Sequence, residues 1–245
     1  MYLWLITKMI KRLARGSANQ ILMGRMKEKG VPEGGRFLKY EVEAILDQAW
    51  KNVDEILPDA NLESMPTKGN QLNVLLAVVT VGAYHALLEA GINKNYAIEL
   101  FADIGWKLYT KFLPLPKFIA GIATRDPQKR INMIMRMFML FPFSTPGRPG
   151  YVCKAWAEEG QFNTYWSHCP PFEFVRKFVE SHGDRGEIAA YQQSWCAYDW
   201  ALTYALVDGS AGNGGYYERP HTLSFGDELC DMRWCAKAPQ GSEAR

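Results

Sequence analysis

A break rich in proline and glycine near the middle of the chain separates two segments whose apolar residues follow different periods. Three prolines and two glycines lie between residues 142 and 150. Before this break apolar residues recur every three or four positions, as in helices, and after it short strand-like runs appear. A pattern with one period does not form the other structure. The sequence therefore predicts an α+β fold, with a helical N-terminal part packed on a C-terminal antiparallel sheet that has two helices.

Helix signals divide the first half into separate elements. Helices are expected over residues 37–57, 71–90 and 95–112, each of which ends at or before a proline or a glycine. Another helix opens at Asp126-Pro127, with proline in its first turn, and runs through a methionine-rich stretch to residue 140. Methionines spaced in this way indicate a soft core or a pliable pocket wall more than a cofactor site.

The second half combines strands with helices. Two strands are expected to pair about Gly160, because turn residues separate two short runs of strand-forming residues. A glycine-rich stretch at 208–215 precedes the last strand region. It lacks the Gly-Lys-Ser/Thr ending of a phosphate loop and opens no helix, so a long connection is favoured. The expected strands are 151–158, 161–169 and the region 216–236, and the expected helices are 172–181 and 187–206.

The N-terminal segment is expected to be an amphipathic helix. Leu3, Ile6, Ile10 and Leu13 are spaced by three or four residues. Basic residues follow the apolar run instead of preceding it, so a secretory signal is a poor match, and the run is too short to span a membrane. Packing on the body of the protein is favoured, and weak membrane-surface contact through residues 1–15 or partner docking is the alternative.

These patterns predict three stretches that form one composite domain. Residues 1–36 hold the amphipathic helix and a linker, residues 37–141 form the helical part, and residues 150–238 form the α+β part with the candidate site. Apolar residues make up 48 % and charged residues 22 % of the 245 residues, which excludes wholesale disorder and allows a sizeable core.

Charge and cysteine content restrict the partners and the compartment. The net charge of +2 is spread along the chain without a nucleic-acid-binding signature, so nucleic acid is not an expected partner. Five cysteines without an export signal or a CxxC pair indicate reduced thiols in a cytoplasmic protein. A small-molecule substrate is expected, no cofactor and no metal are expected, and homo-oligomerisation is left open.

Three cysteines in the last third are the best candidates for chemistry. Cys169 precedes two prolines, Cys196 lies three residues before Asp199 on an expected helix, and Cys230 lies three residues after Asp227. Residues three apart on a helix share a face, so Asp199 is expected beside Cys196. A fold that gathers these thiols and carboxylates would build a site for nucleophilic chemistry or for a metal. Taken singly, each cysteine is more often a small buried apolar residue.

Basic residues and histidines complete the candidate site. Arg219 and Arg233 are candidates for holding a substrate carboxylate, and His168 lies next to Cys169. Neighbouring strand residues face opposite sides, so His168 and Cys169 are not assigned as a dyad. His85 lies within an expected helix, where a core histidine with satisfied hydrogen bonds is the more common case.

Taken together, these motifs resemble a known enzyme family. In chain order they read Cys169-Pro170, Cys196-x-x-Asp199 and Gly226-Asp227-x-x-Cys230-Asp231-Met232-Arg233. With the helical segment Leu75–Gly91 and the sequence Arg125-Asp126-Pro127, they resemble the L-2-amino-thiazoline-4-carboxylic acid hydrolase family from about residue 42 onward. The resemblance implies hydrolytic opening of a small cyclic amidine that carries a carboxylate, with an N-carbamoyl amino acid as the product.

The implied mechanism is attack of a thiolate on the amidine carbon, followed by hydrolysis of the adduct. Cys230 is the favoured nucleophile, Asp227 and Asp199 are the candidate proton handlers or amidinium anchors, and Cys169 and Cys196 are alternative nucleophiles or pocket walls. Three thiolates and a carboxylate would also satisfy a zinc ion, which is a competing interpretation. A cyclase or ring-modifying enzyme of a specialised pathway and a non-catalytic binding module are further alternatives.

Overall fold

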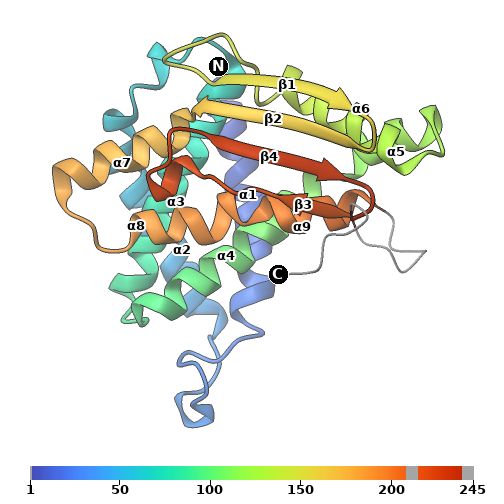
Figure 1. Cartoon of the computed structure of the whole chain (residues 1–245). Coiled ribbons are helices and arrows are strands. Elements are labelled where there is room, and N and C mark those ends of the chain that lie inside the picture. The colour runs from blue at the N-terminus through green and yellow to red at the C-terminus, as the bar shows by residue number, and fades with distance from the viewer. Residues whose placement is uncertain (1, 208–214, 239–245) are drawn as a thin grey trace. The chain divides into compact units, whose positions relative to one another are not determined.

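The computed structural model describes residues 2–207 and 215–238, and it confirms the α+β fold (Figure 1). The chain forms two compact units, each assembled from three stretches of sequence. We call them the helical unit and the sheet unit. Because the chain passes between the units several times, the expected ranges 37–141 and 150–238 do not coincide with them. The helical unit comprises the described residues up to 65, 71–111 and 171–196, and the sheet unit comprises 66–70, 112–170 and the described residues from 197 onward.

The helical unit confirms the helices expected from the first half of the chain. Their ends follow local signals: the Asn93 side chain accepts a hydrogen bond from the Asn95 amide at the start of α4, and Gly91 has a φ of 80° just after α3. The unit contains α1 (Tyr2–Leu22), α2 (Lys39–Ile56), most of α3 (Lys68–Glu89), α4 (Lys94–Tyr109), nearly all of α7 (Pro170–His182), α8 (Glu187–Tyr191), a π-helical turn (Gln192–Cys196) and 3-10 turns at Pro32–Gly34, Leu57–Ala60 and Leu62–Ser64.

The helices of this unit pack at close range. A Cβ atom at Gly82 of α3 would lie 2.7 Å from Val53 Cγ2 and 3.1 Å from the Ala49 carbonyl oxygen of α2. Only glycine permits this approach of the two helices. An apolar cavity of about 60 Å³ remains among α1, α2, α3, α4 and Trp195. Its walls carry almost no polar surface, so it does not suit a charged substrate.

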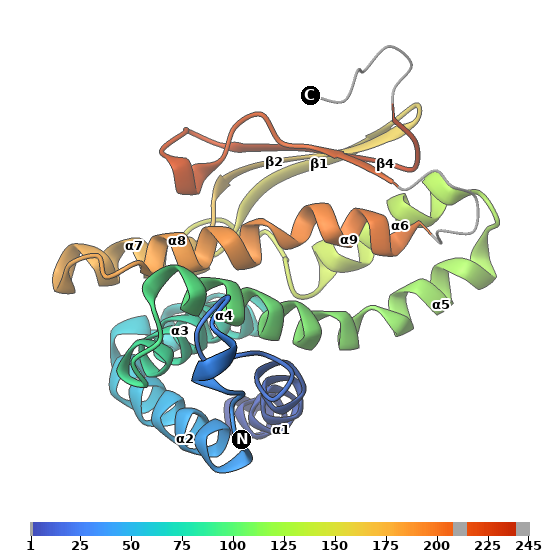
Figure 2. The same ribbon diagram turned by 90° about the horizontal axis from the view of Figure 1, so that it is seen from below.

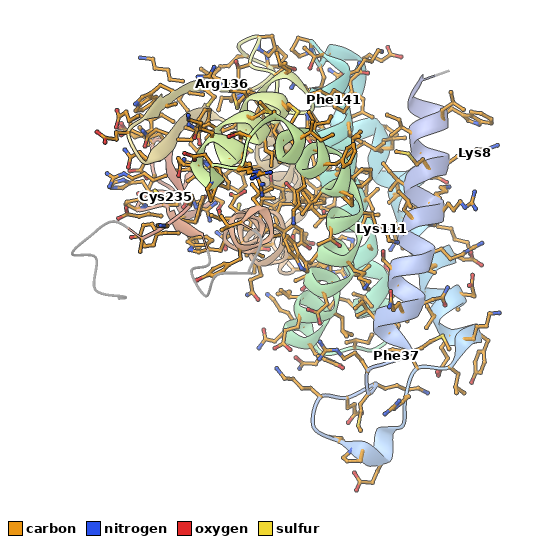
Figure 3. The ribbon with its side chains drawn as sticks, turned by 90° about the vertical axis from the view of Figure 1, so that its right-hand side faces the viewer. Lys8, Phe37, Lys111, Arg136, Phe141 and Cys235 are labelled. Carbon is orange, nitrogen blue, oxygen red and sulfur yellow. The ribbon has the colours of Figure 1, made fainter. Side chains whose placement is uncertain are left out.

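The N-terminal helix packs on the helical unit, as expected. Ile10, Ala14, Ala18 and Leu22 are buried, and α1 contacts α2 and α4. The opposite face is exposed, and Lys8 projects from it away from the other helices (Figure 3). The prediction of an amphipathic helix is therefore confirmed for the side chains from Trp4 onward.

Helix α3 is the one described helix whose length and composition would allow it to cross a membrane. Of its most apolar window, 72 % is buried inside the protein. Its apolar residues Val74, Ala77, Val78 and Val81 all belong to the core. This is the setting of a core helix rather than of a clear transmembrane segment.

The sheet unit is built on four antiparallel strands in the order β1-β2-β4-β3 (Figure 1). The turn at Gly160, which has a φ of 74°, joins β1 to β2 as expected. Helices α6 and α9 lie on the same face of the sheet, where α6 contacts β2 and β4 and α9 contacts β3 (Figure 2). The elements are α5 (Pro114–Ala123), α6 (Pro127–Leu140), β1 (Val152–Glu158), β2 (Gln161–His168), α9 (Tyr198–Leu206), β3 (Tyr216–Glu218), β4 (Cys230–Cys235) and 3-10 turns at Thr110–Phe112 and Leu223–Phe225.

Three expectations about the helices and strands need correction. The helix expected over 187–206 is interrupted by the π-helical turn Gln192–Cys196, so it forms as α8 and α9. The strand region 216–236 is interrupted after residue 218 and resumes as β4, because a turn closes at Gly226. Helix α5 follows Pro114, where the sequence was expected only to end a helix, since proline is also well placed in a first helical turn. The expected connection at 208–215 lies, up to residue 214, outside the described residues.

Candidate functional site

A row of three side chains crosses the sheet at one end of β2. Trp166 of β2 is paired directly with Cys153 of β1 and with Cys230 of β4. Directly opposed residues of an antiparallel sheet point to the same face, so the three side chains are neighbours. They lie in a buried cluster with Tyr151, and the Tyr151 and Trp166 rings are 5.1 Å apart. The partly buried members of this cluster are Met139, Phe143, Cys153, Cys169, Leu223 and Met232.

The cluster contains a buried donor that the described residues do not satisfy. Trp166 is 8 % exposed, and its indole Nε1 has no hydrogen-bond partner in the described part of the chain. Buried N–H groups in native proteins are almost always paired. An acceptor atom of a bound molecule would satisfy this one.

The Cys230 thiol is buried and held by the backbone. Its side chain is 7 % exposed, and the Leu223 amide donates a hydrogen bond to Cys230 Sγ at 3.2 Å. Burial raises the pKa of the thiol to about 11, although this amide and the Arg219 guanidinium act to lower it. The resting thiol is therefore protonated at neutral pH.

A carboxylate, an arginine and a tyrosine form a charged group in the same unit. Arg219 Nη1 donates to Asp199 Oδ2 at 3.0 Å, and the Tyr217 hydroxyl donates to the same oxygen at 3.3 Å. The Arg219 side chain is 3 % exposed, and its guanidinium lies over the Trp200 ring at 4.7 Å from the centroid. The Asp199 carboxylate is thus held in place by two donors that are themselves fixed.

The Asp199 carboxyl group has a raised pKa. Burial raises its pKa to about 6, against the opposing effects of Arg219 and Tyr217. The charged pair also acts on the thiol, because Arg219 lowers and Asp199 raises the pKa of Cys230. A carboxyl group with a raised pKa that is paired with an arginine and electrostatically coupled to a buried thiol is a candidate for acid-base chemistry. The structure thus brings together three of the predicted site residues: Asp199, Arg219 and Cys230.

Cys169, also predicted, lies in the cluster around Cys230. His168 is buried in the same unit, but its Nδ1 donates to the Gly150 carbonyl oxygen at 2.7 Å. Because a carbonyl only accepts, this bond assigns the proton to Nδ1 and gives His168 a role in fixing the chain around Gly150. The hydrogen bond of His168 to Gly150 is therefore a structural contact.

Two predicted residues are engaged elsewhere on the sheet unit. Asp227 Oδ2 accepts the Thr222 amide at 2.7 Å and so closes the turn before β4, which is the role of a turn former. Arg233 is exposed and pairs with Glu218 across β3 and β4, with Nη1 and Oε2 at 3.1 Å. The described contacts of Asp227 and Arg233 are thus those of a turn former and of a surface ion pair.

Cys196 and His85 belong to the helical unit. Cys196 closes the π-helical turn and packs on the apolar core cluster of that unit, whereas Asp199 bonds to the sheet residues Tyr217 and Arg219. The π-helical turn ends at Cys196 and α9 begins at Tyr198, with Ala197 in the helical region between them. That Cys196 and Asp199 share a helix face stays a prediction, because the described contacts of the two side chains do not include each other.

His85 Nε2 lies 2.5 Å from Glu187 Oε1, and Glu187 is 1 % exposed. Burial alone would raise the pKa of Glu187, but hydrogen bonds from His85 and from the backbone amides of Arg185 and Glu187 lower it to about 2. This hydrogen-bonded pair links α3 to α8 within the core. It matches the expectation that His85 is a core histidine whose hydrogen bonds are made inside the protein.

Several members of the site were not singled out from the sequence. Tyr217 and Arg219 are two residues apart around the end of β3, and this spacing could have placed them on one face. Cys153 and Trp166 carry no local signal, because only the register of three strands makes them neighbours of Cys230.

Neither a metal site in the described part of the chain nor a known relative guides the functional assignment, so the geometry of the site is the main guide. Within the described residues, no group of three or more His, Cys, Asp and Glu side chains is arranged to hold a metal ion. The competing zinc interpretation therefore gains no support from the geometry. Comparison of the chain with protein families, with curated proteins and with solved structures finds no match in any of the three.

Proposed function

We propose that this protein is a hydrolase that opens a small cyclic amidine of the 2-amino-thiazoline-4-carboxylate type and releases an N-carbamoyl amino acid. The observation that carries the proposal is the half-buried Asp199 carboxyl group, with a pKa of about 6, held by Arg219 and Tyr217 and electrostatically coupled to the buried Cys230 thiol. The motif resemblance supplies the substrate class. All five cysteines lie among the described residues as thiols outside disulfides, which is consistent with the proposed cytoplasmic location.

The proposed role of Asp199 is to bind the amidinium and to move protons. A planar amidinium pairs with a carboxylate through two hydrogen bonds, as a guanidinium does. At pH 7 most of the Asp199 population is ionised, because its pKa is about 6. Arg219 keeps the carboxylate oriented, and the Trp166 indole N–H is available to an acceptor atom of the substrate.

Cys230 is proposed to attack the amidine carbon in its thiol form. Deprotonating a thiol of pKa about 11 at pH 7 costs about 5 kcal/mol, so no resting thiolate is available. Attack must therefore be coupled to transfer of the thiol proton to Asp199. The new C–S bond forms as the bond from the amidine carbon to the ring sulfur breaks, and the ring sulfur takes the proton.

Water then completes the hydrolysis. The adduct is an isothiourea between Cys230 and the opened substrate. Attack of water on its central carbon breaks the Cys230 C–S bond, forms the carbamoyl C=O group and returns a proton to the thiol. The net change is the addition of one water molecule to the substrate.

Mass-detected turnover of L-2-amino-thiazoline-4-carboxylate by the purified protein tests the proposal. We expect a product one water heavier, with or without a chelator, and a kcat/KM that rises as Asp199 ionises around pH 6. Cys230→Ala should lower turnover by about 10³-fold or more. Cys196→Ala is the matched control, since Cys196 packs on the core of the helical unit, and should retain activity.

Each contrary result has a defined meaning. Full turnover by Cys230→Ala would replace thiol attack by direct attack of water, with Asp199 as the base. Loss of activity with a chelator would favour a metal-dependent reaction. Ring closure of the carbamoyl compound would identify a cyclase, and tight binding without turnover would identify a binding module and contradict the proposal.

A further inference from the structure

Helix α5 exposes an apolar stripe to solvent. Leu115, Phe118, Ile119 and Ile122 are 67 %, 66 %, 43 % and 73 % exposed. Their spacing of three, four and seven residues places them within an arc of about 100° on the helix surface. The opposite side of the helix holds Ala120, which is fully buried. Single exposed apolar residues are common, but four on one short helix face mark an interaction surface.

Further exposed apolar side chains of the α5–α6 hairpin lie just before α5 and at the end of α6. Phe112, just before α5, is 46 % exposed, and Leu140 and Phe141 at the end of α6 are 79 % and 51 % exposed. Helices α5 and α6 pack on each other, so the two helices form a continuous element. Figure 3 views the side of the protein that carries this hairpin, with Phe141 and Arg136 labelled.

The charge of the hairpin is one-sided. Between residues 112 and 141 the sequence contains five basic residues and one acidic residue, Asp126. The Asp126 carboxylate caps α6 by accepting the Lys129 amide at 2.9 Å, so it is already engaged. Arg125, Lys129 and Arg136 are exposed. An excess of exposed basic side chains on an element that also exposes apolar side chains complements an anionic surface.

The length of α5 restricts how the helix could bind a membrane. Its ten residues extend about 15 Å, which is half the hydrocarbon thickness of a bilayer. The helix is therefore too short to span a membrane. A short helix with an apolar face and nearby basic side chains lies in the plane of the interface, with its apolar face below the headgroups and its charges at their level.

We propose that the α5–α6 hairpin docks on an anionic lipid surface, with Leu115, Phe118, Ile119 and Ile122 entering the interface and Arg125, Lys129 and Arg136 contacting the headgroups. This surface is separate from the Cys230 site and from residues 1–15. It would bring the protein to a membrane without a transmembrane segment.

Co-sedimentation of the full chain with lipid vesicles tests the proposal. We expect binding to phosphatidylcholine vesicles that contain about one third phosphatidylglycerol, and much weaker binding to pure phosphatidylcholine. Added salt should weaken binding, because the headgroup contacts are screened. The double substitution Phe118→Glu/Ile122→Glu should lower the partition coefficient by about tenfold or more.

Two further variants control for the added charge and for the position of the substitution. Phe118→Ser/Ile122→Ser removes the apolar groups without adding charge, and its circular dichroism and melting temperature should match those of the unchanged protein. Leu5→Glu is the matched control on α1, where Leu5 is 53 % exposed, and it should leave binding unchanged.

Three outcomes would overturn the proposal. The first is no binding to any vesicle, and the second is loss of binding with Leu5→Glu but not with the α5 variants. The third is concentration-dependent dimerisation without vesicle binding, abolished by the α5 variants, which would assign the stripe to a second copy of the chain.

Discussion

The Asp199 carboxylate should lower the stability of the protein at neutral pH, and Asp199→Asn should remove this cost. The folded-state pKa is raised to about 6 from an ordinary value of 3.8 because the group is buried. Protonation therefore favours the folded state. The associated stability is fully present below pH 3.8 and is lost as the pH rises through 6. At 1.36 kcal/mol per pH unit, the difference between 6 and 3.8 corresponds to about 3 kcal/mol.

Asparagine imitates the protonated carboxyl group in shape and has no charge to bury. Relative to Asp199→Asn, the unchanged protein should therefore lose about 2.4 kcal/mol of unfolding free energy between pH 4 and pH 7.5. The constant cost of leaving Arg219 without a carboxylate partner is present in the variant at every pH. The pH dependence of the difference, rather than its absolute size, carries the result.

Urea denaturation of both proteins across this pH range measures the difference, and other titrating groups cancel in it. Asp47→Asn is the control for the substitution itself, since the Asp47 side chain is 69 % exposed. A difference between Asp199→Asn and the unchanged protein that stays flat from pH 4 to pH 7.5 would refute the reasoning. The same substitution should abolish turnover, because it removes the carboxylate that is proposed to take the thiol proton.

The remaining predictions concern the scaffold. His85→Ala should cost about 3 kcal/mol or more in urea denaturation, because it leaves the buried Glu187 carboxylate without its side-chain partner; an unchanged midpoint would contradict this. Glu187 has a lowered pKa, so its stabilisation is present above pH 4.5 and lost as the pH falls towards 2; Glu187→Gln should flatten this part of an acid titration followed by circular dichroism. Gly82→Ala should destabilise the protein by about 1–3 kcal/mol, since its Cβ would lie 2.7 Å from Val53 Cγ2, and a melting temperature that does not fall would argue against close α2–α3 packing. Asp126→Ala should cost about 1 kcal/mol in the same assay through loss of the α6 cap, and retained stability would show that the cap is dispensable.

Local sequence signals predicted most of the secondary structure. Helices α2, α3, α4 and α6 follow the apolar period and end at the expected glycines and prolines, and the β1–β2 hairpin turns at Gly160. These features depend on residues close together in the chain. The exceptions arise where the same residue has two uses, as with Pro114, which both ends one helix and starts another.

The candidate site could be predicted only in part. Asp199, Arg219 and Cys230 were identified as chemistry-bearing residues by type and motif, and their association depends on α9, β3 and β4 meeting in one unit. A π-helical turn at Gln192–Cys196 divides the helix expected over 187–206, and no local signal in the sequence indicated it.

What the sequence by itself determined is therefore the set of elements, their ends and the residue types capable of chemistry. What only the tertiary structure decided is which of these residues share a burial environment: Cys153 and Trp166 become neighbours of Cys230 through strand register, and Asp199 acquires its raised pKa through burial beside Arg219. The physical reason is that helix and turn preferences are local, whereas register, burial and the resulting shift in proton affinity arise from contacts between residues distant in the chain.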